Sequence, residues 1–158
     1  IRMTEPTLRS THLFTLALQV DPNFTDVGET PYGRRRIATV TGGTFEGEEL
    51  RGTVLPAPGG DWILQRRDGI LQLDVRLTLK TDDGHLVYMS YRGMRHGPAW
   101  VIEKLNKGEK VDPSQYYFRA TPWFETASEK YRFLNRIVCV STGRRDPTGP
   151  VYEVFQIL

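Results

Sequence analysis

The 158-residue sequence predicts an all-β fold, either a two-sheet sandwich or a closed antiparallel barrel. Apolar and polar residues alternate with a period of two along most of the chain, and segments rich in Gly, Pro, Asn and Asp separate these stretches. Two pairs, Asp68-Gly69 and Asp83-Gly84, favour two-residue hairpin turns, because such turns need residues that tolerate a positive φ.

About nine segments carry the strand pattern. In chain order they are residues 11–20, 34–41, 50–56, 61–67, 70–80, 85–95, 115–125, 135–142 and 151–157. Tight turns join the middle segments, so we expect an antiparallel meander there. This many short strands in one chain favours a closed barrel, since closure removes exposed strand edges.

Two short helices are expected between the strands. Residues 98–108 begin with Pro98, place Val101 and Leu105 at helical spacing, and end at Gly108. Residues 128–135 begin with a serine that suits an N-cap. No repeat or linker divides the chain, so we expect residues 1–158 to form one domain.

The composition is that of an ordinary globular domain. The chain has 21 Lys and Arg against 19 Asp and Glu, and their mixing along the sequence argues against a nucleic-acid-binding surface. No apolar stretch reaches the length of a membrane span and no leader is visible, so we expect neither a membrane partner nor secretion. The single cysteine, Cys139, excludes an internal disulfide and favours a cytoplasmic location.

The stretch DWILQRRDGILQLDVR, residues 61–76, carries the first group of candidate residues. If its turn has two residues, Asp61 pairs with Arg76 and lies on the same face as Asp74. The same reasoning through the next turn adds apolar side chains to that face: Val87, Met89 and Tyr91. Such a face would line a partly polar lumen or a subunit interface, although a solvent-exposed ion pair would give the same pattern.

The stretch YYFRATPWFET, residues 116–126, carries the second group. Aromatic side chains flank Arg119 and Glu125, while Pro122 indicates a bend or a sheet edge. Aromatic walls with one cation and one carboxylate suit a small ligand that carries a carbonyl, phenol or carboxylate. A core strand whose charged residues face solvent would fit equally well.

Other common chemistries are disfavoured. The histidines His12, His85 and His96 have no metal-ligand spacing to one another or to Cys139. The segment GGTFEG, residues 42–47, is too short for a phosphate-binding loop, and no Gly-x-Ser-x-Gly nucleophile motif occurs. We therefore expect no metal, nucleotide or other cofactor.

Long ordered strings that cover nearly the whole chain resemble the family catalogued as domain of unknown function 3237. They are YGRRRIATVTGGTFEGEELRGTVLPAPGGDW, DGILQLDVRLTLKTDDGHLVY and VDPSQYYFRATPWFETASEKYRFLN. The family pattern matches at Gly60-Asp61-Trp62, Asp74-Val75-Arg76, Thr81-Asp82-Asp83-Gly84, Tyr116-Tyr117-Phe118-Arg119, Phe124-Glu125-Thr126 and Asn135. The resemblance implies one antiparallel β-barrel of about nine or ten strands with one or two short helices, often in homo-oligomers. It implies no particular reaction.

The sequence favours a cofactor-independent enzyme that acts by acid/base chemistry on a small hydrophobic carbonyl or phenolic compound in the lumen. It would be an isomerase, a cyclase, or a hydratase or lyase. One alternative is a lipocalin-like barrel that binds a small molecule unchanged. Another is a structural oligomer that uses the face of Asp61 and Arg76 as a subunit contact.

The candidate residues have two predicted roles. Asp61, Asp74 or Glu125 would transfer a proton, and Arg76 or Arg119 would stabilise the enolate or phenolate that forms. The predicted substrate-binding residues are Trp62, Tyr88, Tyr117, Phe124 and Asn135, with Tyr88 or Tyr117 able to donate a hydrogen bond to the substrate oxygen.

Overall fold

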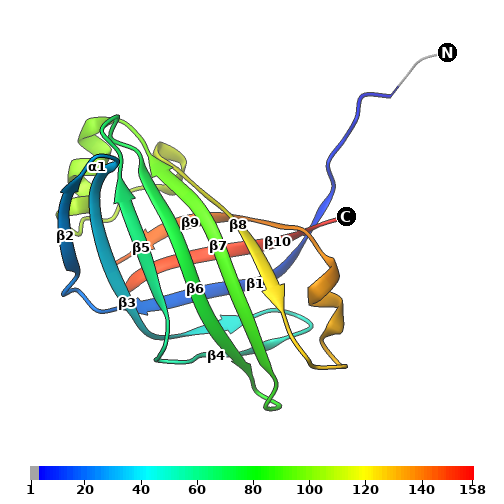
Figure 1. Ribbon diagram of the computed structural model, residues 1–158. Coiled ribbons are helices and arrows are strands. Elements are labelled where there is room, and N and C mark those ends of the chain that lie inside the picture. The colour runs from blue at the N-terminus through cyan, green and yellow to red at the C-terminus, as the bar shows by residue number, and fades with distance from the viewer. Residues whose placement is uncertain (1–3) are drawn as a thin grey trace.

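The structure is a computed structural model that describes residues 4–158. Across these residues one ten-stranded sheet closes into an antiparallel barrel, which confirms the predicted fold class (Figure 1). The elements are β1 (Ser10–Val20), β2 (Thr25–Thr30), β3 (Gly33–Glu46), β4 (Arg51–Val54), β5 (Gly60–Gln65), β6 (Leu71–Thr81), β7 (Leu86–His96), α1 (Ala99–Asn106), η1 (Pro113–Gln115), β8 (Tyr117–Glu125), η2 (Arg132–Arg136), β9 (Cys139–Asp146) and β10 (Gly149–Ile157).

The barrel closes because long strands pair with different neighbours along their length. Strand β1 pairs with β10 on one side and with the second half of β3 on the other. Strands β5 and β4 pair with successive parts of β3, and both also pair with β6. The circuit then continues through β7, β8 and β9 to β10, which leaves β2 as an extension beside the start of β3.

The structure differs from the sequence prediction at three places. The strand expected at residues 135–142 begins only at Cys139, as β9. Strand β2 was not predicted, because its sequence TDVGET lacks apolar alternation and gains its strand form by pairing with β3. The predicted helix at residues 128–135 is present only as the short 3-10 helix η2, so it begins later and is more tightly wound than expected. The predicted helix at residues 98–108 is confirmed as α1, and Gly108 follows it with φ +77°. No helix in the part of the chain that the structure describes has the length and apolarity needed to cross a membrane.

The β5–β6 turn is one residue longer than the sequence suggested. The Arg66 N–H donates to the Ile70 carbonyl at 2.9 Å, and Gly69, with φ +86°, completes a three-residue loop. The extra residue shifts the pairing by one position, so that Asp61 lies opposite Val75 and Gly60 lies opposite Arg76. The predicted pairing of Asp61 with Arg76 is therefore wrong.

The β6–β7 turn has the same extra residue. The Thr81 N–H donates to the His85 carbonyl at 2.9 Å, and Gly84 has φ +91°. Val75 consequently pairs with Tyr91, and these residues share the inner face of the barrel. The prediction that Val87, Met89 and Tyr91 share a face with Asp74 and Arg76 is wrong for the same reason.

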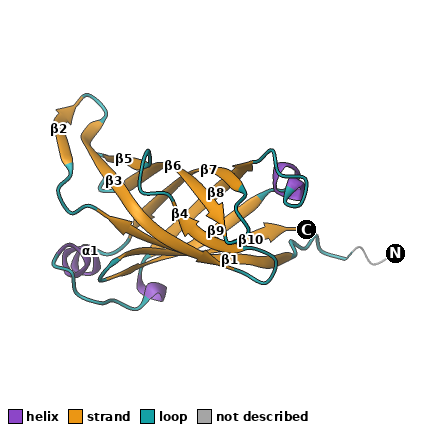
Figure 2. Cartoon of the chain, turned by 90° about the horizontal axis from the view of Figure 1, so that it is seen from below, coloured by secondary structure: helices purple, strands orange, loops and turns teal. Residues whose placement is uncertain are grey.

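The barrel interior changes character along its length. Toward one end it is filled by aromatic and aliphatic side chains, with Phe14 in contact with the rings of Phe45 and Phe124. Helix α1 lies at the other end and buries Val101 and Leu105 against the core, while η2 lies at the end away from α1 (Figures 1 and 2). The interior side chains near α1 include charged and phenolic groups, which form the candidate site.

Candidate functional site

A cavity of about 190 Å³ occupies the lumen toward α1. Its wall is mostly apolar, with side chains such as Val40, Leu73 and Phe118. Six ionisable or phenolic side chains from five strands also reach it: Arg36, Asp61, Tyr91, Arg95, Arg145 and Tyr152. An apolar cavity with a few convergent polar groups is the usual form of a small-molecule site.

Asp61 is the carboxyl of this cavity. The ladder between β5 and β6 is interrupted between Asp61 and Leu64. There the backbone N–H of Asp74 donates a hydrogen bond to the Asp61 Oδ1 at 3.0 Å. Burial raises the pKa of Asp61 to about 7, with a smaller contribution from the negative charge of Asp74. A carboxyl with this pKa can both accept and return a proton near neutral pH.

Two phenols lie beside Asp61. Val75 pairs with Asp61 on one side and with Tyr91 on the other, and the ring of Tyr91 packs edge-on against that of Tyr152 at 5.0 Å between centroids. Burial raises the pKa of both phenols, and the charge of Asp61 raises it further. Both hydroxyls therefore stay protonated, and the Tyr91 hydroxyl lies near that of Tyr152 and has no other hydrogen-bond partner in the described chain.

Three guanidinium groups also reach this cavity, from Arg36, Arg95 and Arg145. Burial and the negative charge of Asp61 raise the pKa of Tyr152, whereas the positive charges of Arg95 and Arg145 lower it. Burial, followed by the charge of Arg145, lowers the pKa of Arg95. No carboxylate in residues 4–158 forms an ion pair with Arg36, Arg95 or Arg145.

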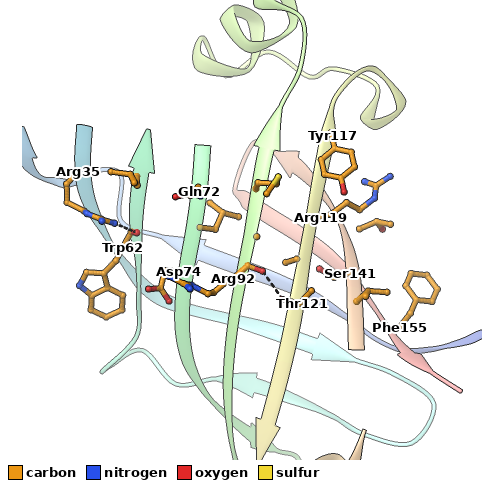
Figure 3. Close-up of a pocket in the computed structure, with 17 residues that line it drawn as sticks. Arg35, Trp62, Gln72, Asp74, Arg92, Tyr117, Arg119, Thr121, Ser141 and Phe155 are labelled. Carbon is orange, nitrogen blue, oxygen red and sulfur yellow. Dashed lines mark hydrogen bonds between the residues drawn. The ribbon is translucent and has the colours of Figure 1, made fainter. Parts of the chain in front are cut away.

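A larger hollow, of about 670 Å³, crosses the outer face of the sheet from β5 to β10 (Figure 3). It contains four of the predicted site residues: Trp62, Asp74, Tyr117 and Arg119. The guanidinium of Arg119 lies over the ring of Tyr117 at 5.2 Å. Because Asp74 faces this hollow, it lies on the opposite side of the sheet from Asp61, contrary to the prediction.

The other predicted residues lie elsewhere. Arg76 is also on the outer face, with its guanidinium 5.9 Å from the ring of Trp62. Tyr88 and Glu125 are exposed and face each other across β7 and β8. Phe124 points inward but belongs to the apolar end of the core. The structure thus brings Asp61 into the lumen and separates it from the rest of the predicted set.

Asn135 connects η2 to the end of β8. Its Oδ1 accepts the Thr126 N–H at 2.8 Å, and its Nδ2 donates to the Thr126 carbonyl at 2.9 Å and to the Arg132 carbonyl at 3.2 Å. These contacts hold the backbone and lie outside both hollows.

We expect Asn135→Ala to lower the free energy of unfolding by about 0.5–1.5 kcal/mol, the usual net contribution of a hydrogen bond, since water can replace the lost partner of the partly exposed Thr126 backbone. Urea denaturation measures this effect, and the exposed neighbour Arg136 replaced by Ala is the control. An unchanged urea midpoint for Asn135→Ala would show that the hydrogen bonds of Asn135 do not stabilise the connection between β8 and η2.

The sequence contained an overlooked signal for the lumen arginines. In RRRIATV, Arg36 has the same parity as Ala38 and Val40, and in YMSYRGMR, Arg95 has the same parity as Met89 and Tyr91. A basic residue at an apolar position of a strand indicates a charge directed into the barrel.

The fold and the site define a small antiparallel β-barrel with ionisable groups in its lumen. The chain belongs to the family described as "Protein of unknown function (DUF3237)", whose sequence profile matches residues 8–157. The UPF0311 protein RPA1785 from Rhodopseudomonas palustris is 37% identical over 153 residues, which are 97% of this chain and 99% of that protein. The crystal structure of RPA1785 matches with a TM-score of 0.91 over the same shares of the two chains.

Two further solved structures have the same fold. A beta-barrel like protein, ABAYE2633, from Acinetobacter baumannii matches at 35% identity and a TM-score of 0.85, over 99% of this chain and 100% of that one. A structure described as an enzyme from Penicillium herquei matches at 21% identity and a TM-score of 0.73, again over 99% and 100% of the two chains. At that identity the likeness concerns the fold alone.

Proposed function

We propose that the protein is a cofactor-independent enzyme that uses Asp61 for acid/base chemistry on a small carbonyl or phenolic compound in the lumen. The observation that carries the proposal is a carboxyl with a pKa of about 7 beside two buried, protonated phenols. A general base works best when its pKa lies near the working pH. The description of the Penicillium herquei structure as an enzyme is compatible with this proposal.

The proposed proton transfer uses Asp61 as the base and the neighbouring Tyr91 hydroxyl as the hydrogen-bond donor. The ionised Asp61 removes a proton from the carbon next to a carbonyl, or from a phenol, and becomes neutral. The protonated Tyr91 hydroxyl donates a hydrogen bond to the oxygen on which negative charge develops. Return of the proton from Asp61 to a different atom of the substrate completes an isomerisation or a ring closure.

The dimensions of the lumen restrict the substrate. An engineered apolar protein cavity of about 150 Å³ accommodates benzene, so the observed 190 Å³ suits roughly one substituted ring. The apolar wall excludes water from the reacting atoms and maintains the high pKa of Asp61. The same apolar wall favours the second candidate, a barrel that binds such a compound unchanged.

The assembly of the protein into a homo-oligomer and its cytoplasmic location remain predictions.

The test compares conversion of monocyclic enones and hydroxylated arenes by wild type, Asp61→Asn and Asp74→Asn. We expect Asp61→Asn to reduce kcat about 10²- to 10⁴-fold, the usual contribution of a general base. Asp74→Asn is the matched control, because it removes a carboxylate of the same strand pair that faces the outer hollow. Loss of activity in Asp74→Asn with full activity in Asp61→Asn would place the reaction on the outer face. Binding without conversion in wild type would favour the second candidate.

A further inference from the structure

Two arginines in the lumen have buried nitrogen atoms without partners. The Nε atoms of Arg36 and Arg95 are inaccessible to solvent and form no hydrogen bond with any described residue. Buried donors in folded proteins nearly always have an acceptor, and buried charges are nearly always paired. With Arg145 nearby and no ion pair to any of the three within residues 4–158, this end of the lumen has uncompensated positive charge.

The two arginines also mark the way into the lumen. A second cavity, of about 230 Å³, lies between the β5–β6 turn and α1, and Gly69, Ile102 and Asn106 contribute to its wall. Arg36 and Arg95 line both this cavity and the lumen cavity. A molecule that enters beside α1 therefore passes the two guanidinium groups before it reaches Tyr91 and Asp61.

An anionic group on the ligand would neutralise the positive charge of the arginines and accept hydrogen bonds from the Nε atoms of Arg36 and Arg95, which have no partner among the described residues. Guanidinium groups bind carboxylates with paired hydrogen bonds, and these charge-assisted bonds are stronger than neutral ones. The remaining lumen wall is largely apolar, with Leu71, Leu73 and Phe118, which suits a flat hydrocarbon body. A cavity of this size leaves room for one ring and one small acidic group.

We propose that the substrate is a monocyclic carboxylic acid, whose carboxylate binds Arg36 and Arg95 while its carbonyl or phenol oxygen lies beside Tyr91 and Asp61. This inference rests on the proposed function, because Asp61 provides the chemistry at the opposite end of the same ligand. It adds the substrate class and a positioning role for the arginines. Holding the carboxylate at one end fixes which atoms of the ring face Asp61.

The experiment measures binding of 4-hydroxybenzoate and 4-hydroxybenzamide by calorimetry. These probes share a ring and a phenol and differ in charge. We expect wild type to bind the carboxylate about 10- to 100-fold more tightly than the amide, the usual range for charge-assisted hydrogen bonds. Arg95→Gln and Arg36→Gln should each remove most of this preference. Arg92→Gln, on the same strand as Arg95 but facing the outer hollow, should retain it.

Equal affinities for acid and amide, no binding of either probe, or an unchanged preference in Arg95→Gln and Arg36→Gln would each overturn the inference. Preferential binding of 4-hydroxyphenyl phosphate over the carboxylate would also overturn it. The Asp61→Asn variant separates this inference from the proposed function. We expect it to keep the preference for the carboxylate while conversion is lost. Selective carboxylate binding with no turnover of any monocyclic acid by wild type would support the carboxylate-binding role of Arg36 and Arg95 and contradict the proposed function.

Discussion

Asp61→Asn is expected to stabilise the protein at pH 8 by about 2–4 kcal/mol. The pKa of Asp61 rises from 3.8 in the unfolded chain to about 7 in the barrel because of burial. That difference corresponds to about 4 kcal/mol of unfavourable free energy for keeping the ionised carboxylate in the folded protein. Asparagine is neutral, and its Oδ1 can still accept the backbone N–H of Asp74.

The stabilisation should depend on pH with a definite sign. Below about pH 4 the carboxyl is protonated in both states, and it adds no penalty. Between about pH 4 and 7 the unfolded chain loses this proton while the folded chain keeps it, so the wild-type free energy of unfolding falls as pH rises. Above about pH 7 both states are ionised, and the penalty reaches its full size.

Urea denaturation of wild type and Asp61→Asn at about pH 4, 6 and 8 measures this dependence. The difference between the two proteins isolates Asp61, because the neighbouring ionisable groups of the cavity, Arg36, Arg95 and Arg145 among them, are common to both. Asp74→Asn serves as the control and should show a smaller difference. The prediction would be contradicted if the difference in free energy of unfolding between wild type and Asp61→Asn stayed constant over this pH range. It would also be contradicted if Asp61→Asn were less stable than wild type at pH 8.

A stabilising substitution at a charged residue would itself be informative. Proteins retain unfavourable buried charges chiefly where function requires them. The cavity combines such a charge with two arginine Nε atoms that lack partners in the described structure. Both features oppose folding in the free protein, and both would be relieved by a ligand that accepts the arginine hydrogen bonds and exchanges a proton with Asp61.

The strands could be predicted from the sequence because alternation reflects burial on one face. Strands β6 and β7 lie within one or two residues of the expected segments 70–80 and 85–95. The register could not be predicted as well, because the same Asp-Gly pair occurs in two-residue and three-residue loops. One extra residue moved Arg76 from the position opposite Asp61 to the position opposite Gly60.

The site was less predictable than the fold. Asp61 was identified, but the face to which it belongs depends on the length of one loop, and its pKa depends on a burial that no local pattern reveals. The lumen arginines were missed because the run Arg34-Arg35-Arg36 reads as a solvated basic segment. Its residues in fact alternate, with Arg35 in the outer hollow and Arg36 in the lumen.

The second substitution with a large expected effect is at Phe14, in the apolar part of the barrel interior away from the cavity that holds Asp61. Phe14 is fully buried, and its ring lies 5.4 Å from that of Phe45 and 5.7 Å from that of Phe124, measured between centroids. We expect Phe14→Ala to lower the free energy of unfolding by about 3–5 kcal/mol, since a lost aromatic side chain leaves a cavity that neighbouring strands cannot fill. Phe14→Leu, which keeps most of the volume, should cost less.

Urea denaturation gives the size of this effect, and calorimetry on the folded variant tests where it acts. Phe14 does not line the cavity that holds Asp61 and Arg95, so binding of 4-hydroxybenzoate by folded Phe14→Ala should stay within about threefold of wild type. A loss below about 1 kcal/mol would show that the aromatic cluster is loosely packed. A large loss of affinity together with the expected loss of stability would show that the two parts of the interior are coupled. Unchanged affinity would mean that the apolar part holds the barrel closed while the part near α1 carries the unfavourable charges of the site.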